Sequence, residues 1–308
     1  MQRFENWMSY SFDGVEYGTK TKDTKNFTIN FNKKFKPIPS LKEALYKNGS
    51  LMRDMYTEPF DVCLSGGTDS EIVVRVFKDL KIKHNTFIFR CENDLNYRDV
   101  AQAIELCNEL NIDYKIIDFN MQKFFENDAY DLLNETLMTS ILHLPRVKWF
   151  EYLDNIPVMG DGDPYWHREL ESDFSKKSRW YYPLNESTLP ITISARRFNR
   201  VAIPDWYEYT PYTVLASVRH PVFKALINDE VPGKISTWSS RHLLYKDVWP
   251  NLKNKPKLTG YEYYGSPTTI PSYIEDFVKR IGANDVVLDE QDIHYTISEL
   301  EELLIDYD

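Results

Sequence analysis

The stretch that decides the fold runs from residue 60 to residue 70 and reads Phe-Asp-Val-Cys-Leu-Ser-Gly-Gly-Thr-Asp-Ser. Residues 60–64 form a short apolar run, which is typical of a strand buried in a parallel sheet. Residues 69–80 then place apolar side chains at helical spacing, at Ile72, Val73 and Val76. The stretch therefore predicts a strand, a tight turn of small residues and an amphipathic helix.

The same alternation continues downstream. Residues 85–89, 113–117 and 156–159 read as strands, and residues 97–110 read as a helix between the first two of them. Alternating strands and helices predict a parallel sheet with right-handed crossovers. We therefore expect an α/β protein with a doubly wound parallel sheet and a mostly helical C-terminal extension.

Elements outside this sheet are also predicted from local patterns. Residues 27–31 alternate apolar and polar side chains, which indicates a strand. Residues 41–55 read as a helix with Ser40 as its N-cap. Residues 121–153 read as helical, with a break expected at His143-Leu144-Pro145.

The chain is divided into three parts on these patterns. Residues 1–58 form a lead-in segment of unassigned role, and residues 59–165 form the core that carries the glycine loop. Residues 166–308 form a helical remainder that is rich in aromatic residues and punctuated by prolines.

Composition excludes several classes of protein. The formal net charge of -10 disfavours a nucleic-acid partner held by bulk electrostatics. Three cysteines without a Cys-x-x-Cys pair indicate neither a disulfide framework nor a structural zinc site, and favour a reducing cytoplasm. Because no run of about 18 apolar residues occurs, we expect no membrane span.

The glycine loop has the residue types of an anion site. Gly66 and Gly67 allow positive φ and a close approach of a ligand to the backbone. Successive amides and the following helix N-terminus attract anions, and Ser65 and Ser70 add hydroxyl donors. Asp69 would repel a phosphate directly, so its best role is to hold Mg²⁺. The plainer alternative is a tight turn that caps the helix.

At this point a family resemblance enters. The string Ser-Gly-Gly-Thr-Asp-Ser at residues 65–70 resembles the pyrophosphate loop of the ATP-pyrophosphatase, or PP-loop, superfamily. The resemblance implies that the chain binds ATP and Mg²⁺ and cleaves ATP to AMP and pyrophosphate in order to activate another molecule. The string lacks the Gly-Lys-Ser/Thr ending of a Walker loop, which disfavours a kinase or GTPase.

Further segments resemble one branch, formed by the synthetase domain of asparagine synthetase and by β-lactam synthetase. They are residues 87–97, 158–163 and 241–262. The resemblance implies a ligase that adenylates a small-molecule or peptide carboxylate and forms an amide or C–N bond. It also implies individual roles, namely Phe89 at adenine, Gly160 at the nucleotide, Asp163 with Asp69 on Mg²⁺, Asp161 as the catalytic acid, and Lys257, or failing it Lys255, at the departing pyrophosphate.

The sequence also departs from that branch. Asp161 replaces a glutamate, and the spacing to the next acid, Asp163, is one residue shorter than in the branch. Gln2 stands where the glutaminase nucleophile would be, so we expect the amine to come from ammonia, a separate glutaminase or the substrate itself.

Two other functions remain open on the sequence. One is a sulfur-transfer or tRNA-modifying enzyme of the same superfamily, for which Cys91 and Cys107 would be the catalytic cysteines. The other is a non-catalytic nucleotide-binding protein, which the altered segment at 160–163 allows.

Overall fold

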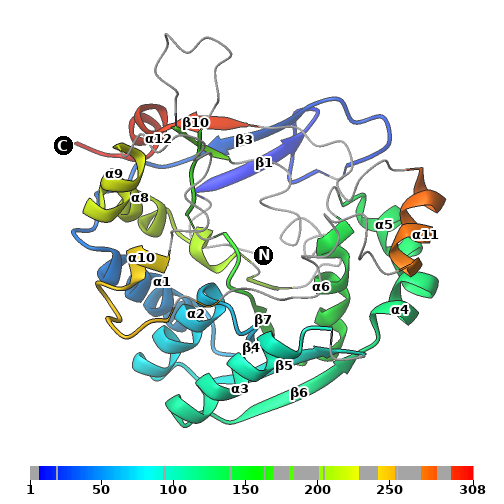
Figure 1. Ribbon diagram of the computed structural model, residues 1–308. Helices are drawn as coiled ribbons and strands as arrows, with labels where there is room; N and C mark the ends of the chain where they lie inside the picture. Colours follow the sequence, from blue (N-terminus) through cyan, green and yellow to red (C-terminus); the bar gives the residue numbers. More distant parts are fainter. Residues whose placement is uncertain are drawn as a thin grey trace.

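The computed structural model contains a four-stranded parallel sheet, which lies at the lower side of the view in Figure 1. Its strands are β4 (Phe60–Cys63), β5 (His84–Cys91), β6 (Tyr114–Phe119) and β7 (Ile156–Val158), in the order β6-β5-β4-β7. The chain moves outward from β4 to β6 and then returns to the other side of β4. This reversal confirms the predicted doubly wound sheet, and it leaves a crevice beyond the carboxyl ends of β4 and β7.

The structure describes most of the chain, in segments separated by gaps. They are residues 7–18, 20–92, 95–138, 141–162, 164–168, 180–183, 201–203, 205–228, 242–253, 255, 272–282 and 293–307. Lys257 and Asp163, both named above as site residues, lie outside them.

Helices cover both faces of the sheet, as alternate strand residues show. Val62 and Ile88 point into a core shared with α1 (Leu41–Met55), α2 (Thr68–Asp79) and α3 (Tyr97–Leu110). Cys63 and Phe87, their opposite-facing neighbours, point into a second core. This second core is built by α4 (Met121–Lys123), a π-helical turn (Phe124–Asp128), α5 (Ala129–Thr136), α6 (Leu144–Trp149) and α11 (Ser272–Ile281).

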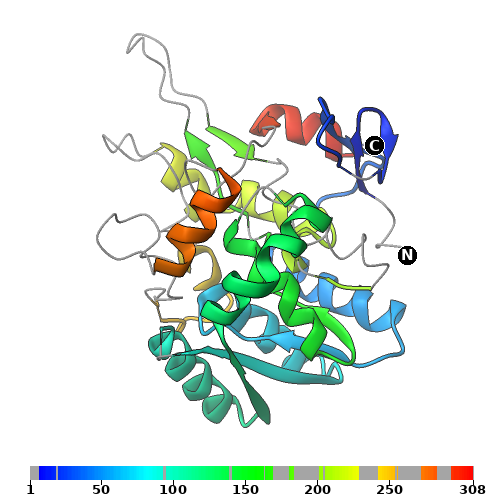
Figure 2. The same ribbon diagram turned by 90° about the vertical axis from the view of Figure 1, so that its right-hand side faces the viewer.

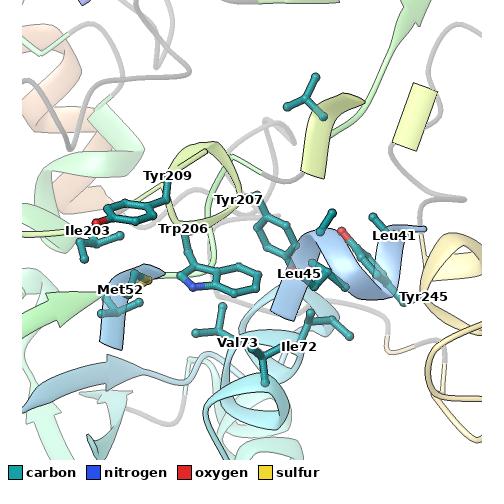
Figure 3. Close-up of a cluster of buried hydrophobic side chains, with 14 of the residues drawn as sticks. Leu41, Leu45, Met52, Ile72, Val73, Ile203, Trp206, Tyr207, Tyr209 and Tyr245 are labelled. Carbon is teal, nitrogen blue, oxygen red and sulfur yellow. The ribbon is translucent and has the colours of Figure 1, made fainter. Parts of the chain in front are cut away.

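The first core continues into the C-terminal half of the chain. Figure 3 shows Trp206 beside Met52 of α1 and Val73 of α2. Asn48 of α1 is fully buried, and its amide donates to the Trp206 carbonyl at 3.1 Å. These contacts make α1 part of the packing that supports α2. Helices α8 (Tyr212–Arg219), α9 (Pro221–Asn228) and α10 (His242–Tyr245) also contribute to this core.

Two small antiparallel sheets complete the described structure. One contains β1 (Met8–Phe12), β2 (Val15–Glu16) and β3 (Phe27–Phe31), and the other contains β8 (His167–Arg168), β9 (Trp180–Pro183) and β10 (His294–Thr296). Figures 1 and 2 show α12 (Ile297–Leu304) beside the first sheet. The Phe35 amide donates to the Leu304 carbonyl at 2.7 Å, which joins the two ends of the chain.

Most local predictions are confirmed, and one is wrong in detail. The helix at 41–55 begins after Ser40, whose hydroxyl accepts from the Glu43 amide at 3.2 Å. The break predicted at residues 143–145 occurs earlier, because Leu137 adopts a left-handed conformation with φ of 47°. Pro145 lies in the first turn of α6, where a missing amide proton costs nothing.

The C-terminal part is helical as expected, although β8, β9 and β10 were not predicted. None of the helices in the described segments is long and apolar enough to cross a membrane.

The buried amide of Asn48 gives a test of the link between α1 and the C-terminal half. Besides Trp206, it donates to Thr213 Oγ1 at 3.2 Å and accepts from the Thr210 hydroxyl. We expect Asn48→Ala to lower the free energy of unfolding by about 2–4 kcal/mol, since its buried partners lose their bonds. Urea unfolding followed by circular dichroism measures this change.

The matched control is Asn134→Ala on α5, where the exposed amide bonds only within its own helix. We expect it to change the same free energy by less than about 0.5 kcal/mol. Equal effects of the two substitutions would contradict a supporting role of α1.

Candidate active site

A pocket opens at the carboxyl ends of β4, β5 and β7, where the strand order reverses. It encloses about 700 Å³, including the part that is open to solvent. This position is where open α/β sheets bind ligands. Its walls are formed by Cys63, Leu64, Ser65, Asp69, Ser70, Phe89, Cys91, Asn96, Asp99, Arg146, Trp149, Met159, Gly160 and Asp161.

The N-terminus of α2 faces this pocket without a side-chain cap. Gly67 is the N-cap residue, in an extended conformation, and makes no side-chain capping bond. The first amides of an α-helix have no partner inside the helix and carry partial positive charge. The end of α2 therefore has no side-chain cap at the place where the glycine loop predicts an anion site.

Two glycines let other backbone segments touch the loop. Gly66 has φ of +81°, and a Cβ on it would lie 2.1 Å from the carbonyl oxygen of Asp99 at the start of α3. A Cβ on Gly160, after β7, would lie 2.8 Å from the amide nitrogen of Ser70. Because real Cβ atoms do not approach this closely, both positions require glycine. The glycine loop is thus clamped between α3 and the segment after β7.

The two loop serines bond to each other. Their hydroxyl oxygens lie 3.0 Å apart, and Ser70 Oγ also accepts from the Ser65 amide at 3.1 Å and donates to the Gly67 carbonyl at 3.2 Å. Ser70 is buried, whereas Ser65 is exposed to the pocket. Ser70 therefore shapes the loop, and Ser65 is the serine better placed to reach a phosphate.

Tyr207 holds the glycine loop through a hydrogen bond to its backbone. Its buried hydroxyl donates to the carbonyl oxygen of Asp69 at 2.9 Å. The segment that carries it pairs with the segment after β7, since the Tyr207 amide donates to the Asp161 carbonyl at 3.4 Å. The aromatic-rich C-terminal half therefore contributes to the position of the loop.

The charges around the pocket are mostly negative. Asp69, Asp99 and Asp161 line it, together with Arg146 from α6. Arg146 Nη1 donates to both carboxylate oxygens of Asp161, at 2.8 Å each. Asp161, the predicted catalytic acid, is therefore held in an ion pair.

Asp69 fits the predicted role in holding Mg²⁺. It is buried at the start of α2 and lines the pocket. The described residues contain no group of three or more acidic, histidine or cysteine side chains arranged around a metal position. Mg²⁺ commonly needs only one or two protein carboxylates when phosphates complete its ligands. The donor set thus suits a metal that arrives with a nucleotide.

Aromatic rings form the wall of the pocket beside β5. Phe89, predicted to contact adenine, stacks on Trp149 of α6 with ring centroids 4.4 Å apart and planes 9° apart. Asn96 fixes the end of the strand, because it donates to the Phe89 carbonyl and accepts from the Cys91 amide, both at 2.8 Å. A flat base entering here would meet Trp149 as well as Phe89.

The cysteines do not form a reactive pair. Cys107 packs in the core on one face of the sheet, whereas Cys91 packs on the other face. Cys63 also lines the pocket, but its register partner on β5 is Phe87, four residues before Cys91. This places the two thiols roughly 13 Å apart along the strands.

Burial keeps the thiols protonated. It raises the pKa of Cys91 to about 12, with nearby Glu92 and Asp99 adding to the shift. Burial also raises the pKa of Cys107 to about 11 and that of Cys63 well above its usual range.

The structure brings most of the predicted site residues to one place. Ser65, Asp69, Ser70, Phe89, Gly160 and Asp161 line the pocket, and Gly66 and Gly67 form the loop between them. Asp163 and Lys257 lie outside the described residues. Lys255, the alternative to Lys257, is not among the residues that line the pocket. Its Nζ forms an ion pair with Glu71 Oε2 on α2, at 2.6 Å.

The lining residues that were not predicted include Asn96, Asp99, Arg146 and Trp149. Asn96 is the N-cap residue of α3 and Asp99 lies in the first turn of that helix, so their place shortly after β5 is a usable signal. Arg146 and Trp149 lie in the crossover between β6 and β7, where the sequence shows only a helix.

No family model and no curated protein matches this sequence. Among solved structures it is similar to NMN synthetase from Francisella tularensis, with 20% identity and a TM-score of 0.31 over 40% of this chain. It spans 55% of that protein, about half of its length.

Two further similar structures are NAD synthetases. The NH3-dependent enzyme from Campylobacter jejuni subsp. jejuni NCTC 11168, in complex with nitrate, has 14% identity and a TM-score of 0.33 over 80% of this chain and 94% of its own. The glutamine-dependent enzyme from Acinetobacter baumannii, in complex with ADP, has 10% identity and a TM-score of 0.32 over 83% of this chain and 49% of its own. Scores this low carry no argument, and the asparagine synthetase branch stays a prediction.

The contact at Gly66 gives a test of the loop. The resemblance predicts that this loop binds ATP, so we expect Gly66→Ala to abolish that binding, because the new Cβ would collide with the Asp99 carbonyl and move the loop amides. Isothermal titration calorimetry with MgATP measures binding, and urea unfolding measures stability.

Gly14→Ala is the matched control, since Gly14 also has φ of +81° but has open space around its Cβ position. Gly14→Ala should lower the free energy of unfolding only by the conformational strain of about 1–2 kcal/mol, and it should leave MgATP binding unchanged. Gly66→Ala should cost at least ~2 kcal/mol more than this. Similar costs and normal binding would contradict the clamp on the loop.

The raised thiol pKa values predict slow chemical labelling. At pH 8 only about one Cys91 side chain in 10,000 is a thiolate, since the pKa is about 12. We expect DTNB to react slowly with native protein and rapidly after unfolding in urea. Because the folded pKa values lie above the usual range, the native rate should keep rising well beyond pH 9. Rapid labelling of Cys91 at pH 7 would contradict this.

Proposed function

We propose that this protein is an ATP-dependent, AMP-forming ligase that adenylates a carboxylate and then forms an amide or C–N bond. The observation that carries the proposal is one pocket that gathers Asp69, Asp161, Phe89 and the uncapped N-terminus of α2 at the reversal of the strand order. Each of these groups suits one part of that chemistry.

ATP would lie with its phosphates at α2 and its base toward the aromatic wall. The amides of the pyrophosphate loop would hold the β- and γ-phosphates, and Ser65 would add a hydroxyl donor. Phe89 and Trp149 would bound the adenine on one side. Asp69, with Asp163 as its proposed partner, would hold Mg²⁺, which when bound neutralises phosphate charge.

The first step is the transfer of AMP to the acceptor. An oxygen of the carboxylate attacks the α-phosphorus, and the bond to the bridging oxygen breaks, so that pyrophosphate leaves with the electron pair. The clamped amides hold the departing charge without rearranging, which is the main protein contribution to such a step. Lys257 is proposed to add a positive charge there.

The second step releases AMP. An amine attacks the carbonyl carbon of the acyl-adenylate and loses a proton to Asp161. The bond between that carbon and the phosphate oxygen breaks, and AMP leaves with this oxygen and the electron pair. We propose ammonia, a separate glutaminase or an amine of the substrate itself as the nitrogen source. Three buried free thiols suit a reducing compartment such as the cytoplasm.

The sulfur-transfer alternative has less support. Its proposed pair, Cys91 and Cys107, lies on opposite faces of the sheet, and burial raises the pKa of each thiol. A non-catalytic nucleotide-binding protein remains the alternative that the experiment below separates from a ligase.

ATP–pyrophosphate exchange tests the proposal, measured with aliphatic, amino-acid and aromatic carboxylates. We expect exchange with at least one carboxylate, and we expect Asp69→Asn to lower its rate about 100-fold or more, because a bound metal contributes several kcal/mol. Lys257→Ala should lower the maximal rate in the same assay.

Two matched controls are available on the surface. Asp118→Asn removes a carboxylate from an exposed pair on β6, and Lys253→Ala removes a lysine from an exposed pair with Glu105. Both should leave the exchange rate within about twofold, since surface ion pairs contribute little. If the protein binds ATP but none of the tested carboxylates supports exchange, the protein is non-catalytic.

A further inference from the structure

Arg146 is the one basic side chain among the described residues that line the pocket. It shares the pocket with three aspartates, Asp69, Asp99 and Asp161. An anion that enters meets repulsion from these carboxylates unless a fixed donor faces it. The amides of α2 are donors at the glycine loop, on one side of the pocket. Arg146 on α6 is a second donor to the same pocket.

The ion pair of Arg146 with Asp161 shows how this group holds a carboxylate. One nitrogen, Nη1, donates to both oxygens at 2.8 Å. The arginine side chain is 19% exposed and the aspartate side chain is 33% exposed, so the pair opens to the pocket. A guanidinium stays protonated at all relevant pH values, so it carries its charge whichever carboxylate it contacts.

The pair also lies next to the loop that would hold the phosphates. Asp161 directly follows Gly160, whose Cβ position is 2.8 Å from the Ser70 amide nitrogen. Trp149 is three residues from Arg146 on α6, which places both on one side of the helix. A carboxylate at Arg146 would therefore lie near the phosphates, with an aromatic ring beside the rest of its molecule.

We propose that Arg146 binds the carboxylate of the acceptor substrate, which takes the place of the Asp161 carboxylate in the ion pair. This inference rests on the proposed ligase function. The exchange keeps one negative charge on the arginine, so it avoids the cost of leaving a partly buried charge alone. It also releases Asp161, which then accepts the proton of the attacking amine. Acceptor binding and release of the base are thus one event.

The experiment compares Arg146→Gln and Arg146→Lys with wild type in ATP–pyrophosphate exchange. The carboxylate that gives the fastest wild-type exchange is the probe. We expect Arg146→Gln to raise the KM of the carboxylate about 10- to 100-fold, as for loss of one charged hydrogen bond. The KM of ATP should change by less than about threefold, because the loop amides hold the phosphates.

Arg146→Lys should give an intermediate KM, since lysine keeps the charge but not the planar fork. The matched control is Arg90→Gln, which breaks an exposed pair with Asp118 and should behave as wild type. A changed KM for ATP with an unchanged KM for the carboxylate would overturn the inference and leave the ligase proposal intact.

A second measurement covers the case in which wild type exchanges with no carboxylate, so that the ligase proposal fails. Protein labelled with ¹⁵N in its arginine side chains is titrated with formate, the smallest carboxylate, and separately with chloride. The resonance that is missing from the Arg146→Lys spectrum identifies Arg146. A shift with formate and none with chloride supports carboxylate binding at Arg146, and no shift overturns it.

Discussion

The site depends on the contact of three backbone segments at the N-terminus of α2. Gly66 touches the start of α3, and Gly160 touches the amide of Ser70, each at a distance that leaves no room for a Cβ atom. Tyr207 adds a hydrogen bond to the Asp69 carbonyl from the C-terminal half. The amides of α2 are therefore fixed before a ligand arrives, so that binding an anion requires little ordering of the loop. This fixed geometry is also what the departing charge of a pyrophosphate would need.

The central sheet could be predicted because each of its elements is decided locally. The strand at 60–64, the glycine turn and the helix at 69–80 follow one another within a few residues, and the α/β pattern repeats after them. The strands β8, β9 and β10 could not be predicted, since they are two to four residues long and β10 is far from its partner in the chain. The same holds for the turn at Leu137, where a left-handed leucine carries no sequence signal.

The candidate site was predictable where its residues lie near the carboxyl end of a strand or in the turn and helix start that follow it. Ser65, Phe89, Gly160 and Asp161 lie at or just after the ends of β4, β5 and β7, and parallel strands bring such ends together. Arg146 and Trp149 come from a crossover helix, and their distance from the pocket depends on how α6 packs on the sheet. Tyr207 reaches the loop through a pairing of residues more than 130 positions apart. Tertiary packing of this kind leaves no local pattern.

The balance of charge explains how an acidic protein could recognise an anion. The chain carries a net charge of -10, and three aspartates line the pocket, so the long-range field repels a nucleotide. Beyond about 8 Å, physiological salt screens this repulsion, whereas donors in direct contact act with almost full strength. Recognition then depends on groups with fixed direction, the amides of α2 at one end and the guanidinium of Arg146 at the other. On the proposed function, an anion with oxygens at both positions would gain the most against the aspartates, so the acidic pocket would favour selectivity over rapid capture.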